Sequence, residues 1–502
     1  MSDQRVIIIG AGLGGLMCGA ILAREGYRVT VVEKNAHIGG CLQSYHRCGT
    51  VFDTGMHIFG GMAHDGNIRL ICDYLGITDQ LTISDLDKSA DVEVFVKNND
   101  QSINFNMHRR SFVNNLAEIF PDQKDNLERY LDKVDAVMDC MDLFHLRRCS
   151  SRPHSTSNPD FLIAANEFVD KYIDDYRLRA LMSVFNILYA GEYNITPAYL
   201  HSSITSIFLN GACRIVGGYQ NLAKALADVI TGANGQIHTL SHVSKIILND
   251  GRATQVVTNR GKVFEGDYFI YASPVTSLCD MVGDNDVLSR NYRLFMASRH
   301  DSLSSFIVNI KLKKNTIPYN NRIGFYLEDY SSVWNYDAVA GIDKFMYMTP
   351  PTLNQGEYAE TLNIVAPMSW QAVKQWENVV NRHCDPSYEN FKNKVTNAII
   401  DRLENIYPHI KDSIEYIDSA TPLTIHDFTG VRGGAMCGLR KNCADPMPFI
   451  PLHTKIPNLL LTGQSVNMHG FCGVTLTAIQ TCEAILGRDY LINKINPHET
   501  TD

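Results

Sequence analysis

The sequence predicts an α/β protein in which a parallel, dinucleotide-binding sheet is assembled from separate parts of the chain. Three stretches indicate this fold: a strand–helix–strand unit at the N-terminus, a helix with a β-meander in the middle, and a strand–loop–helix unit near the C-terminus. The two long segments between them lack such features, and we expect them to form a mixed α+β domain inserted into the first.

The N-terminal unit begins with an apolar strand, Val6–Ile9, and continues through a glycine-rich turn into a helix, Leu13–Arg24. A second strand, Arg28–Val32, completes a βαβ unit. Glycine permits the tight turn, lets the backbone approach a pyrophosphate and lets the helix pack closely on the sheet, while the helix N-terminus faces the phosphates. The residues expected at this dinucleotide site are Gly10, Gly12, Leu13, Gly14 and Gly15.

Glu33, directly after the second strand, narrows the choice of dinucleotide. A carboxylate there accepts both ribose hydroxyls, whereas a 2′-phosphate would favour arginine, so NAD and FAD remain. The pair Gly39–Gly40 would let a second loop pass close to the diphosphate, which favours FAD; the alternative is a glycine turn that opens an ordinary loop. We expect Glu33, Lys34, Gly39 and Gly40 to contact the cofactor.

The C-terminal unit has a similar arrangement of strand, glycine and helix. An apolar strand, Leu459–Thr462, stops at Gly463, and a loop leads to a helix, Val474–Leu486, whose early residues are small. The positive end of that helix would suit the anionic edge of a reduced flavin, and the alternative is a generic strand–helix ending. The cofactor contacts expected here are Gly463, Gln464, Gly473 and Val474.

The middle stretch combines a helix, Gly217–Ile230, with a short strand, Gln236–Leu240. A β-meander follows from about Val243 to Phe264, because two Asn-x-Gly turn signals separate short strand-like runs. It leads into an apolar strand, Tyr268–Ala272, which we expect to join the parallel sheet.

Together these three stretches resemble the discontinuous FAD domain of the amine oxidase and phytoene desaturase superfamily. The resemblance implies a Rossmann-type FAD-binding domain in which the backbone near Val243 meets the adenine and the final helix points at the isoalloxazine. It also implies that this domain comprises residues 1–79, 211–280 and 416–502, with a substrate domain inserted as residues 80–210, mainly helical, and 281–415.

The inserts show helical periodicity at Asn126–Arg147 and Asn166–Tyr189 and a strand-like run at Ser304–Leu312. Within them the segment Leu178–Ala190 is unusually apolar. It predicts a core helix, and the alternative is a tunnel wall or a membrane-dipping lip for a lipid substrate.

Further elements narrow the family. The run FDTGMH, Phe52–His57, resembles an element of carotenoid isomerases and retinol saturases, and the run Thr421–Lys441 resembles their TPLT element. Cys41 replaces the arginine that commonly follows the glycine pair in amine oxidases. The resemblance implies an FAD-dependent oxidoreductase that desaturates, saturates or isomerises carbon–carbon bonds of an apolar polyene or isoprenoid lipid, such as a carotenoid or retinoid, by hydride transfer at flavin N5.

Two other functions stay open on the sequence: a flavin amine oxidase, and an FAD-bearing protein that binds a lipid without turning it over. Cys41 and the lack of an obvious aromatic cage beside the final motif count against the amine oxidase. The direction of the reaction and the electron partner also stay open.

Proton transfer at carbon needs an acid or a base, and three histidines are the catalytic candidates. His57 follows the FDTG loop, His469 precedes the final helix, and His426 stands beside Asp427 on an expected strand, where neighbouring side chains point to opposite faces. For each of the three, the alternative is a structural role, such as a hydrogen bond to the backbone. We expect Asp53 to fix its own turn by accepting backbone N–H bonds.

The composition excludes several classes of function. The 502 residues carry a formal net charge of −9 without a stripe of basic residues, so we expect no nucleic-acid partner. Thirteen cysteines form no CxxC pair, and we expect no metal site. No run reaches about 18 consecutive apolar residues, and no signal peptide is evident. We therefore expect a cytoplasmic protein whose membrane contact is at most peripheral, with the oligomeric state left open.

Overall fold

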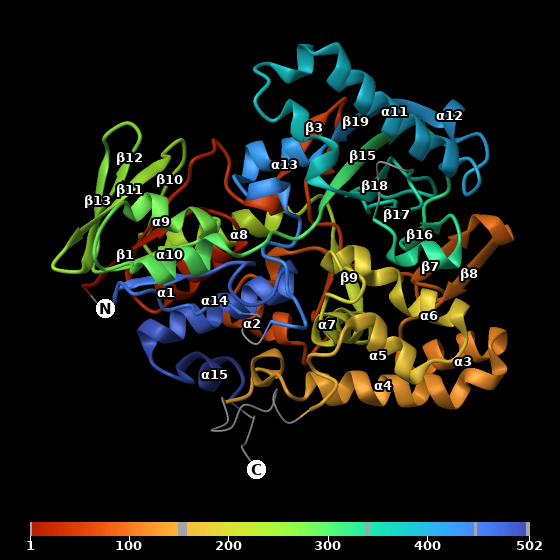
Figure 1. Ribbon diagram of the computed structural model, residues 1–502, viewed down its shortest axis with the longest axis horizontal. Coiled ribbons are helices and arrows are strands. Elements are labelled where there is room, and N and C mark those ends of the chain that lie inside the picture. The colour runs from red at the N-terminus through yellow and green to blue at the C-terminus, as the bar shows by residue number, and fades with distance from the viewer. Residues whose placement is uncertain (1–2, 149–157, 337–340, 446–448, 498–502) are drawn as a thin grey trace.

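The computed structural model describes residues 3–148, 158–336, 341–445 and 449–497. It confirms an α/β fold with two main sheets, one parallel and one mixed, which lie at opposite ends of the molecule and are both covered by helices (Figure 1). The residues between these two sheets carry the candidate site.

The five strands of the first sheet all run parallel, in the order β10–β2–β1–β14–β20. They come from all three stretches that the sequence singled out: β1 (Arg5–Ile9), β2 (Arg28–Val32), β10 (Gln236–His238), β14 (Tyr268–Tyr271) and β20 (Leu459–Leu461). The three stretches therefore form a single sheet, with β1 at its centre.

Alternate residues of β1 serve the two faces of this sheet, as the two-residue period of a strand requires. Val6 and Ile8 pack against the helices on one face, whereas Ile7 and Ile9 pack against the meander on the other. All four are at most 3% exposed. A parallel strand covered on both faces needs such a continuous apolar run, which is why β1 is apolar at every one of these positions.

The layers on the two faces differ in kind. One face is covered by α1 (Leu13–Arg24), α8 (Gln220–Gly232) and α14 (Gly470–Leu486), with α2 (Asn67–Leu75) and α15 (Tyr490–Ile495) beyond them. The other is covered by the antiparallel meander of β11 (Val243–Asn249), β12 (Arg252–Thr258) and β13 (Val263–Glu265) and by α9 (Leu278–Val282) and α10 (Arg290–Ala297) (Figure 1).

The second sheet has seven strands and is antiparallel except for the pair β16–β7. In spatial order the strands are β19 (Ile414–Ala420), β15 (Ser304–Leu312), β18 (Thr361–Met368), β17 (Lys344–Met348), β16 (Ile323–Leu327), β7 (Val92–Val96) and β8 (Gln101–Phe105). The insert 80–210, expected to be mainly helical, thus also supplies two strands, and the expected boundary at residue 416 falls inside β19.

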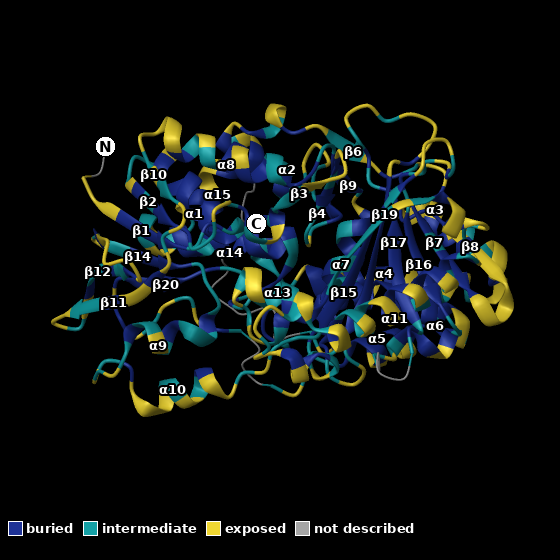
Figure 2. Cartoon of the chain, turned by 90° about the horizontal axis from the view of Figure 1, so that it is seen from above, coloured by how far each residue is buried: buried dark blue, intermediate teal, exposed yellow. Residues whose placement is uncertain are grey.

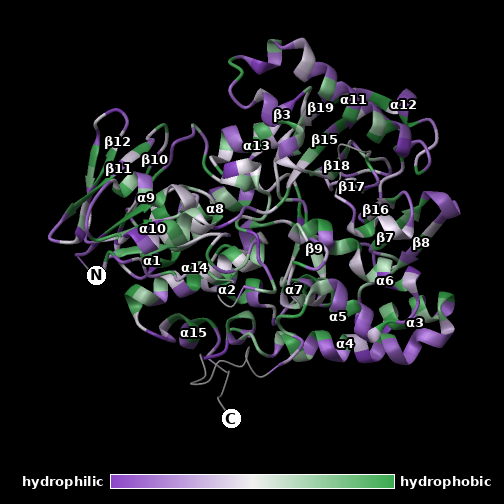
Figure 3. Ribbon diagram, in the orientation of Figure 1, coloured by the Kyte–Doolittle hydropathy of each residue, from purple (hydrophilic) through white to green (hydrophobic). Residues whose placement is uncertain are grey.

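Helices cover both faces of the mixed sheet. One face carries α3 (Arg109–Ile119), α4 (Lys124–Met138), α5 (Ala165–Tyr172), α6 (Tyr176–Ser183) and α7 (Ala198–Leu209); the other carries α11 (Pro386–Leu403), followed by α12 (Ile410–Ser413) and α13 (Pro422–Thr429). The strands lie between these two layers in Figure 1, and Figure 2 shows that they are largely buried. Hydrophilic residues gather on the outer sides of helices such as α3 and α4 (Figure 3).

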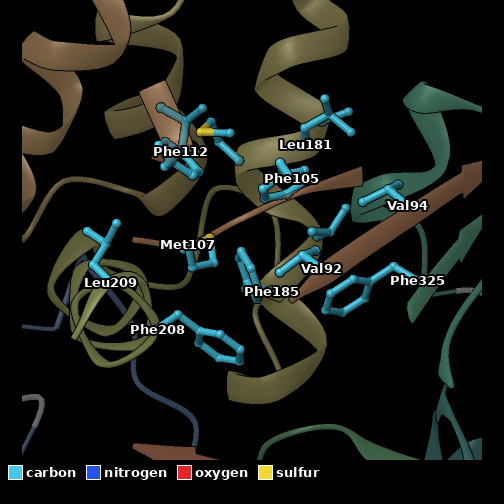
Figure 4. Close-up of a cluster of buried hydrophobic side chains, with 14 of the residues drawn as sticks. Val92, Val94, Phe105, Met107, Phe112, Leu181, Phe185, Phe208, Leu209 and Phe325 are labelled. Atoms are coloured by element: carbon cyan, nitrogen blue, oxygen red, sulfur yellow. The ribbon is translucent and has the colours of Figure 1, made fainter. Parts of the chain in front are cut away.

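The core under α3–α7 is rich in aromatic and branched residues. Phe105, Phe112, Phe185, Phe208 and Phe325 meet there with aliphatic side chains from β7 and α6 (Figure 4). Burying each such side chain contributes about 1.5–3 kcal/mol, against about 0–1 kcal/mol for an exposed ion pair, so this cluster stabilises the mixed sheet more than surface ion pairs do.

Short strands connect the part of the molecule built on the parallel sheet with the part built on the mixed sheet. The strand β3 (Ser44–Arg47) pairs with β4 (Thr50–Asp53), and β9 (Ala212–Ile215) lies between β5 (Phe59–Gly60) and β6 (Ile83–Asp85). These strands frame the FDTG loop, which ends β4 and leads toward β5.

The helical periodicity over residues 166–189 is confirmed, but the chain divides it into three consecutive helices. It forms α5, then α6, whose N-cap Asp175 accepts hydrogen bonds from the N–H groups of Arg177 and Leu178, and then a 3₁₀ helix, Val184–Tyr189. The apolar side chains of this segment, such as Leu181 and Phe185, are buried in the core, so it is no membrane-dipping lip. In the described part of the chain no helix combines the length and apolar character needed to cross a bilayer.

The close packing of α1 on β1 depends on Gly15. A Cβ atom there would lie 2.0 Å from the Gly10 carbonyl oxygen, so the backbone would have to move. We expect Gly15→Ala to destabilise the protein by about 3 kcal/mol or more, measured as a lowered apparent Tm by calorimetry. Gly232→Ala is the matched control, because a Cβ there meets nothing within 4 Å; it should be neutral or stabilise by up to about 1 kcal/mol. Equal Tm values for the two variants would contradict the packing argument.

Candidate active site

The two glycine motifs of the N-terminal segment meet at the end of β1. The Gly39 N–H group donates to the Ala11 carbonyl oxygen at 2.7 Å, and Gly12 and Gly39 form an isolated parallel bridge. A Cβ on Gly40 would lie 3.1 Å from the Gly12 Cα, and both Gly39 and Gly40 have positive φ angles, of 116° and 57°. The second loop therefore passes directly over the first turn, as the glycine spacing indicates.

Gly12 itself has room for a side chain. Its φ of −75° is open to any residue, and a Cβ there would meet nothing within 4 Å. The same is true of the space beside Gly463 and Gly470. The fold does not need a glycine at position 12, so the missing side chain leaves space for a ligand at the N-terminus of α1.

Cys41, directly after the second glycine pair, lies beside the FDTG loop. It is exposed, yet the protein around it raises the pKa of its thiol. Gly55 of the FDTG loop lies against Cys41, since a Cβ on Gly55 would be 3.4 Å from the Cys41 Cβ.

Glu33 lies buried at the end of β2 and turns its carboxylate toward the first turn. It accepts hydrogen bonds from the N–H groups of Ala11, at 2.7 Å, and Asn35, at 2.8 Å. Its backbone carbonyl accepts from the Ser241 N–H group, which brings the start of β11 and Val243 to the same edge of the sheet. Each carboxylate oxygen keeps a free lone pair for a ribose hydroxyl.

The closing segment packs against the first helix. A Cβ on Gly14 would lie 3.2 Å from the Gly463 Cα and 3.4 Å from a methyl group of Val474. Gly473 packs on Met468, where a Cβ would approach to 2.5 Å. The N-termini of α1 and α14 therefore face the same open region from two sides. Gln464 lies beside Gly438 of the TPLT element.

The expectation that Asp53 fixes its own turn is wrong. Its Oδ1 atom accepts hydrogen bonds from the Ser44 hydroxyl at 2.6 Å and from the Tyr219 backbone N–H group at 3.0 Å. It therefore ties β4 to β3 and to the segment before α8. Burial raises the pKa of Asp53 to about 6, and the two hydrogen bonds oppose that shift without cancelling it.

His57 follows the FDTG loop and is 8% exposed. Among the residues that the structure describes, neither of its ring nitrogens has a hydrogen-bond partner, so the expected alternative, a bond to backbone, is not seen there. Burial and the positive charge of Arg214 lower the pKa of His57 to about 4, and the ring is neutral at pH 7. Arg214 is itself buried and donates to the Asn321 side chain and the Arg322 carbonyl oxygen.

His469 is the N-cap residue of α14 but does not cap it through its side chain. The ring is 8% exposed and forms a hydrogen bond with the backbone of Leu188, as the structural alternative predicts, whereas its Nε2 atom has no partner among the described residues. Burial and the positive charge of Lys441 lower its pKa to about 4, so it too is neutral at pH 7. Both candidate histidines are therefore neutral at pH 7.

His426 lies on a helix, and the strand expected there is wrong. The chain forms α13, with Thr421 and Thr424 in a capping box and Pro422 at its first position. The ring Nδ1 lies 2.8 Å from the Val431 carbonyl oxygen, and Asp427 pairs with Arg382 at 2.8 Å. His426 and Asp427 therefore have separate partners and form no acid–carboxylate pair.

Two buried cations escaped the sequence reasoning. Arg214 on β9 is 1% exposed and Lys441, at the end of the TPLT element, is 5% exposed. Both side chains are buried by residues from distant segments, so their burial becomes evident only in the three-dimensional structure.

The chain matches a known family over most of its length. The family described as flavin containing amine oxidoreductase matches residues 13–325. The chain belongs to this family. A zebrafish (Danio rerio) all-trans-retinol 13,14-reductase is 26% identical, over 96% of this chain and 86% of that protein. A chloroplastic prolycopene isomerase 2 from an Oncidium hybrid cultivar is 23% identical, over 94% of this chain and 83% of that protein.

Solved structures agree on the fold. An oxidoreductase from Methanosarcina mazei superposes with a TM-score of 0.64 at 16% identity, covering 96% of this chain and all of that one. A putrescine oxidase bound to putrescine gives 0.65 at 13% identity, over 97% of this chain and all of that one. At such identities the likeness establishes the architecture alone.

A substitution at Gly12 can test ligand binding separately from folding. We expect Gly12→Val to fold with an apparent Tm close to that of the flavin-free parent, because a Cβ there meets no protein atom within 4 Å, but to lose the yellow colour of bound flavin. Cys437→Ser is the control and should stay yellow. Absorbance near 450 nm per protein, with calorimetry, tests both. A stoichiometric flavin in Gly12→Val would show that the site is misassigned.

Asp53 predicts a pH-dependent stability. Its pKa is raised from 3.8 to about 6 in the folded state, so the folded state binds the proton more tightly and this residue's contribution becomes more favourable as pH falls through that window. Asp53→Asn keeps the Oδ1 acceptor and removes the buried charge. We expect it to raise the apparent Tm at about pH 8 and to change it little at about pH 4.5. The exposed Asp65→Asn is the control. An equal gain at both pH values would contradict the assignment.

Proposed function

We propose that this flavin oxidoreductase uses FAD to act on carbon–carbon bonds of an apolar polyene or isoprenoid lipid, by desaturation, saturation or isomerisation. The observation that carries the proposal is the extent of the likeness to the retinol reductase, which spans 96% of this chain and so includes the inserts that select a substrate. A likeness confined to the cofactor segments would have supported the flavin alone.

The glycine-lined space fits FAD. In our proposal the diphosphate lies over Gly12 at the N-terminus of α1, Glu33 receives the ribose hydroxyls, and the isoalloxazine lies toward the N-terminus of α14. The cofactor domain would then comprise the three segments that supply the parallel sheet. The residues that would hold the cofactor are Gly10, Gly12, Leu13, Gly14, Gly15, Glu33, Lys34, Gly39, Gly40, Val243, Gly463, Gln464, Gly473 and Val474.

Apolar surroundings at both candidate histidines support an apolar substrate. Ile58 follows His57 and Met468 precedes His469, and both belong to the hydrophobic cluster that α3–α7 form on the mixed sheet. Met436 of the TPLT element packs against the same cluster. A cationic amine brought into this environment would lose its hydration without gaining a charged partner, whereas a polyene would lose none.

The bound flavin would supply hydride transfer, and the chain would position the substrate, exclude water and handle one proton. At pH 7 the neutral rings of His57 and His469 can receive a proton but hold none to release as imidazolium. They therefore suit proton acceptance in a desaturation, and in a saturation they would relay a proton delivered from elsewhere.

A second function is favoured by the description of the family itself, which is that of amine oxidoreductases. Oxidation of an amine substrate would then produce hydrogen peroxide in air. A third possibility is a protein that binds a lipid beside its flavin without turnover; dithionite would then bleach the flavin, and no substrate or product would.

A turnover assay distinguishes these functions. We expect the yellow protein, incubated with a carotenoid or retinoid with oxidised and with dithionite-reduced flavin, to yield a product with changed double bonds on chromatography. Gly12→Val, which should lack flavin, is the matched control. Peroxide released with amines, and no polyene product, would overturn the proposal, as would an amine found in place of a lipid in the purified protein.

A further inference from the structure

Lys441 is a buried cation that the proposed reaction leaves without a role. Its side chain is 5% exposed, and its Nζ atom donates one long hydrogen bond, of 3.4 Å, to the Ser465 carbonyl oxygen. The ring of Phe449 lies 5.6 Å from the same atom. Ser465 belongs to the loop between β20 and α14, so Lys441 lies directly behind the closing segment of the proposed FAD site.

The neighbouring charged groups do not balance the positive charge of Lys441. Arg299 and Asp445 pair with each other at 2.6 Å, so the nearest carboxylate already has a cation, and His469 is neutral. Within the described ranges no carboxylate forms an ion pair with Lys441. Burial and the positive charge of Arg299 lower the pKa of Lys441 to about 7, and Asp445 opposes that shift.

A second source of positive potential lies beside it. The helix α14 is 17 residues long, and no side chain caps its N-terminus. Its N-cap residue, His469, is buried with an unpartnered Nε2 atom, and a Cβ on the next residue, Gly470, would meet nothing within 4 Å. Free N–H groups at the start of α14, the Nε2 atom of His469 and the ammonium group of Lys441 therefore lie in one part of the structure, where the charge of Lys441 acts on the His469 ring.

A buried ammonium group without a counter-charge is costly, so this arrangement calls for an anion. Two anionic parts of FAD could fill it: the diphosphate, and the ring edge that carries a negative charge after reduction. The first turn at Gly12 already provides the diphosphate site in the proposed function. The anion at the N-terminus of α14 would then be present only in the reduced state.

We propose that Lys441 is the counter-charge of the reduced flavin and so acts as a positioning residue for the electron-loaded state. This inference rests on the proposed FAD site. Reduction would deliver two electrons and one proton to the flavin and leave one negative charge on it, and the ammonium group of Lys441 would balance that charge. The loaded site would then be neutral overall.

Redox titration of the FAD-loaded protein tests the assignment without any lipid substrate. We expect Lys441→Met to lower the midpoint potential by at least about 30 mV at neutral pH, which for a two-electron couple is a tenfold loss of preference for the reduced flavin. Lys441→Arg keeps a charge and should retain the potential. Lys455→Met, at an exposed lysine in the same part of the chain, is the matched control and should change nothing.

The spectrum of the reduced flavin gives a second measurement, independent of the potential. The parent protein should show the anionic reduced spectrum from about pH 6 to about pH 9, whereas Lys441→Met should convert to the neutral reduced form at the acid end. Unchanged potential and spectrum in Lys441→Met, with FAD bound, would overturn this inference alone. Absence of FAD from the parent protein would overturn the proposed function as well. Should Lys441→Met not fold, a neutral reduced spectrum of the parent at about pH 6 would still refute the counter-charge.

Discussion

The backbone contact at the end of β1 is the constraint on which the rest of the structure depends. The Gly12 turn touches Gly39 and Gly40, and Gly14 touches Gly463, so segments more than 400 residues apart in the chain approach to van der Waals distance. Side chains at Gly14 and Gly40 would crowd the neighbouring backbone at these contacts. The contact also places the N-termini of α1 and α14 at the carboxyl edge of the parallel sheet, where open α/β sheets bind their ligands.

Local patterns were legible in the sequence, and long-range pairing was not. The strand β2, the helix α1 and the strand β15 have the predicted bounds, because apolar periodicity and glycine spacing are properties of neighbouring residues. The parallel pairing of β7 with β16 joins distant parts of the chain through backbone bonds, and no residue type encodes that partner. The helix at His426 could have been predicted, because Thr421–Pro422 is a recognisable helix start.

The candidate site, like the fold, was predictable from the sequence only in part. Its glycines follow a recognisable spacing in the sequence, but the electrostatic state of His57 and His469 depends on burial and on two cations, Arg214 and Lys441. Only folding brings those charges near the histidines. The sequence therefore located the cofactor region better than it described the chemistry beside it.

The two sides of this region differ in what they can stabilise. Toward the inserts, apolar residues and neutral imidazoles surround the site, which favours an uncharged substrate. Toward the closing helix, a helix end contributes about 0.3–1 kcal/mol to an adjacent anion. The ammonium group of Lys441 carries a full positive charge, whereas a helix end carries about half of one. In our proposal the two therefore act together on a reduced flavin, and Lys441 supplies the charge that the helix end alone lacks.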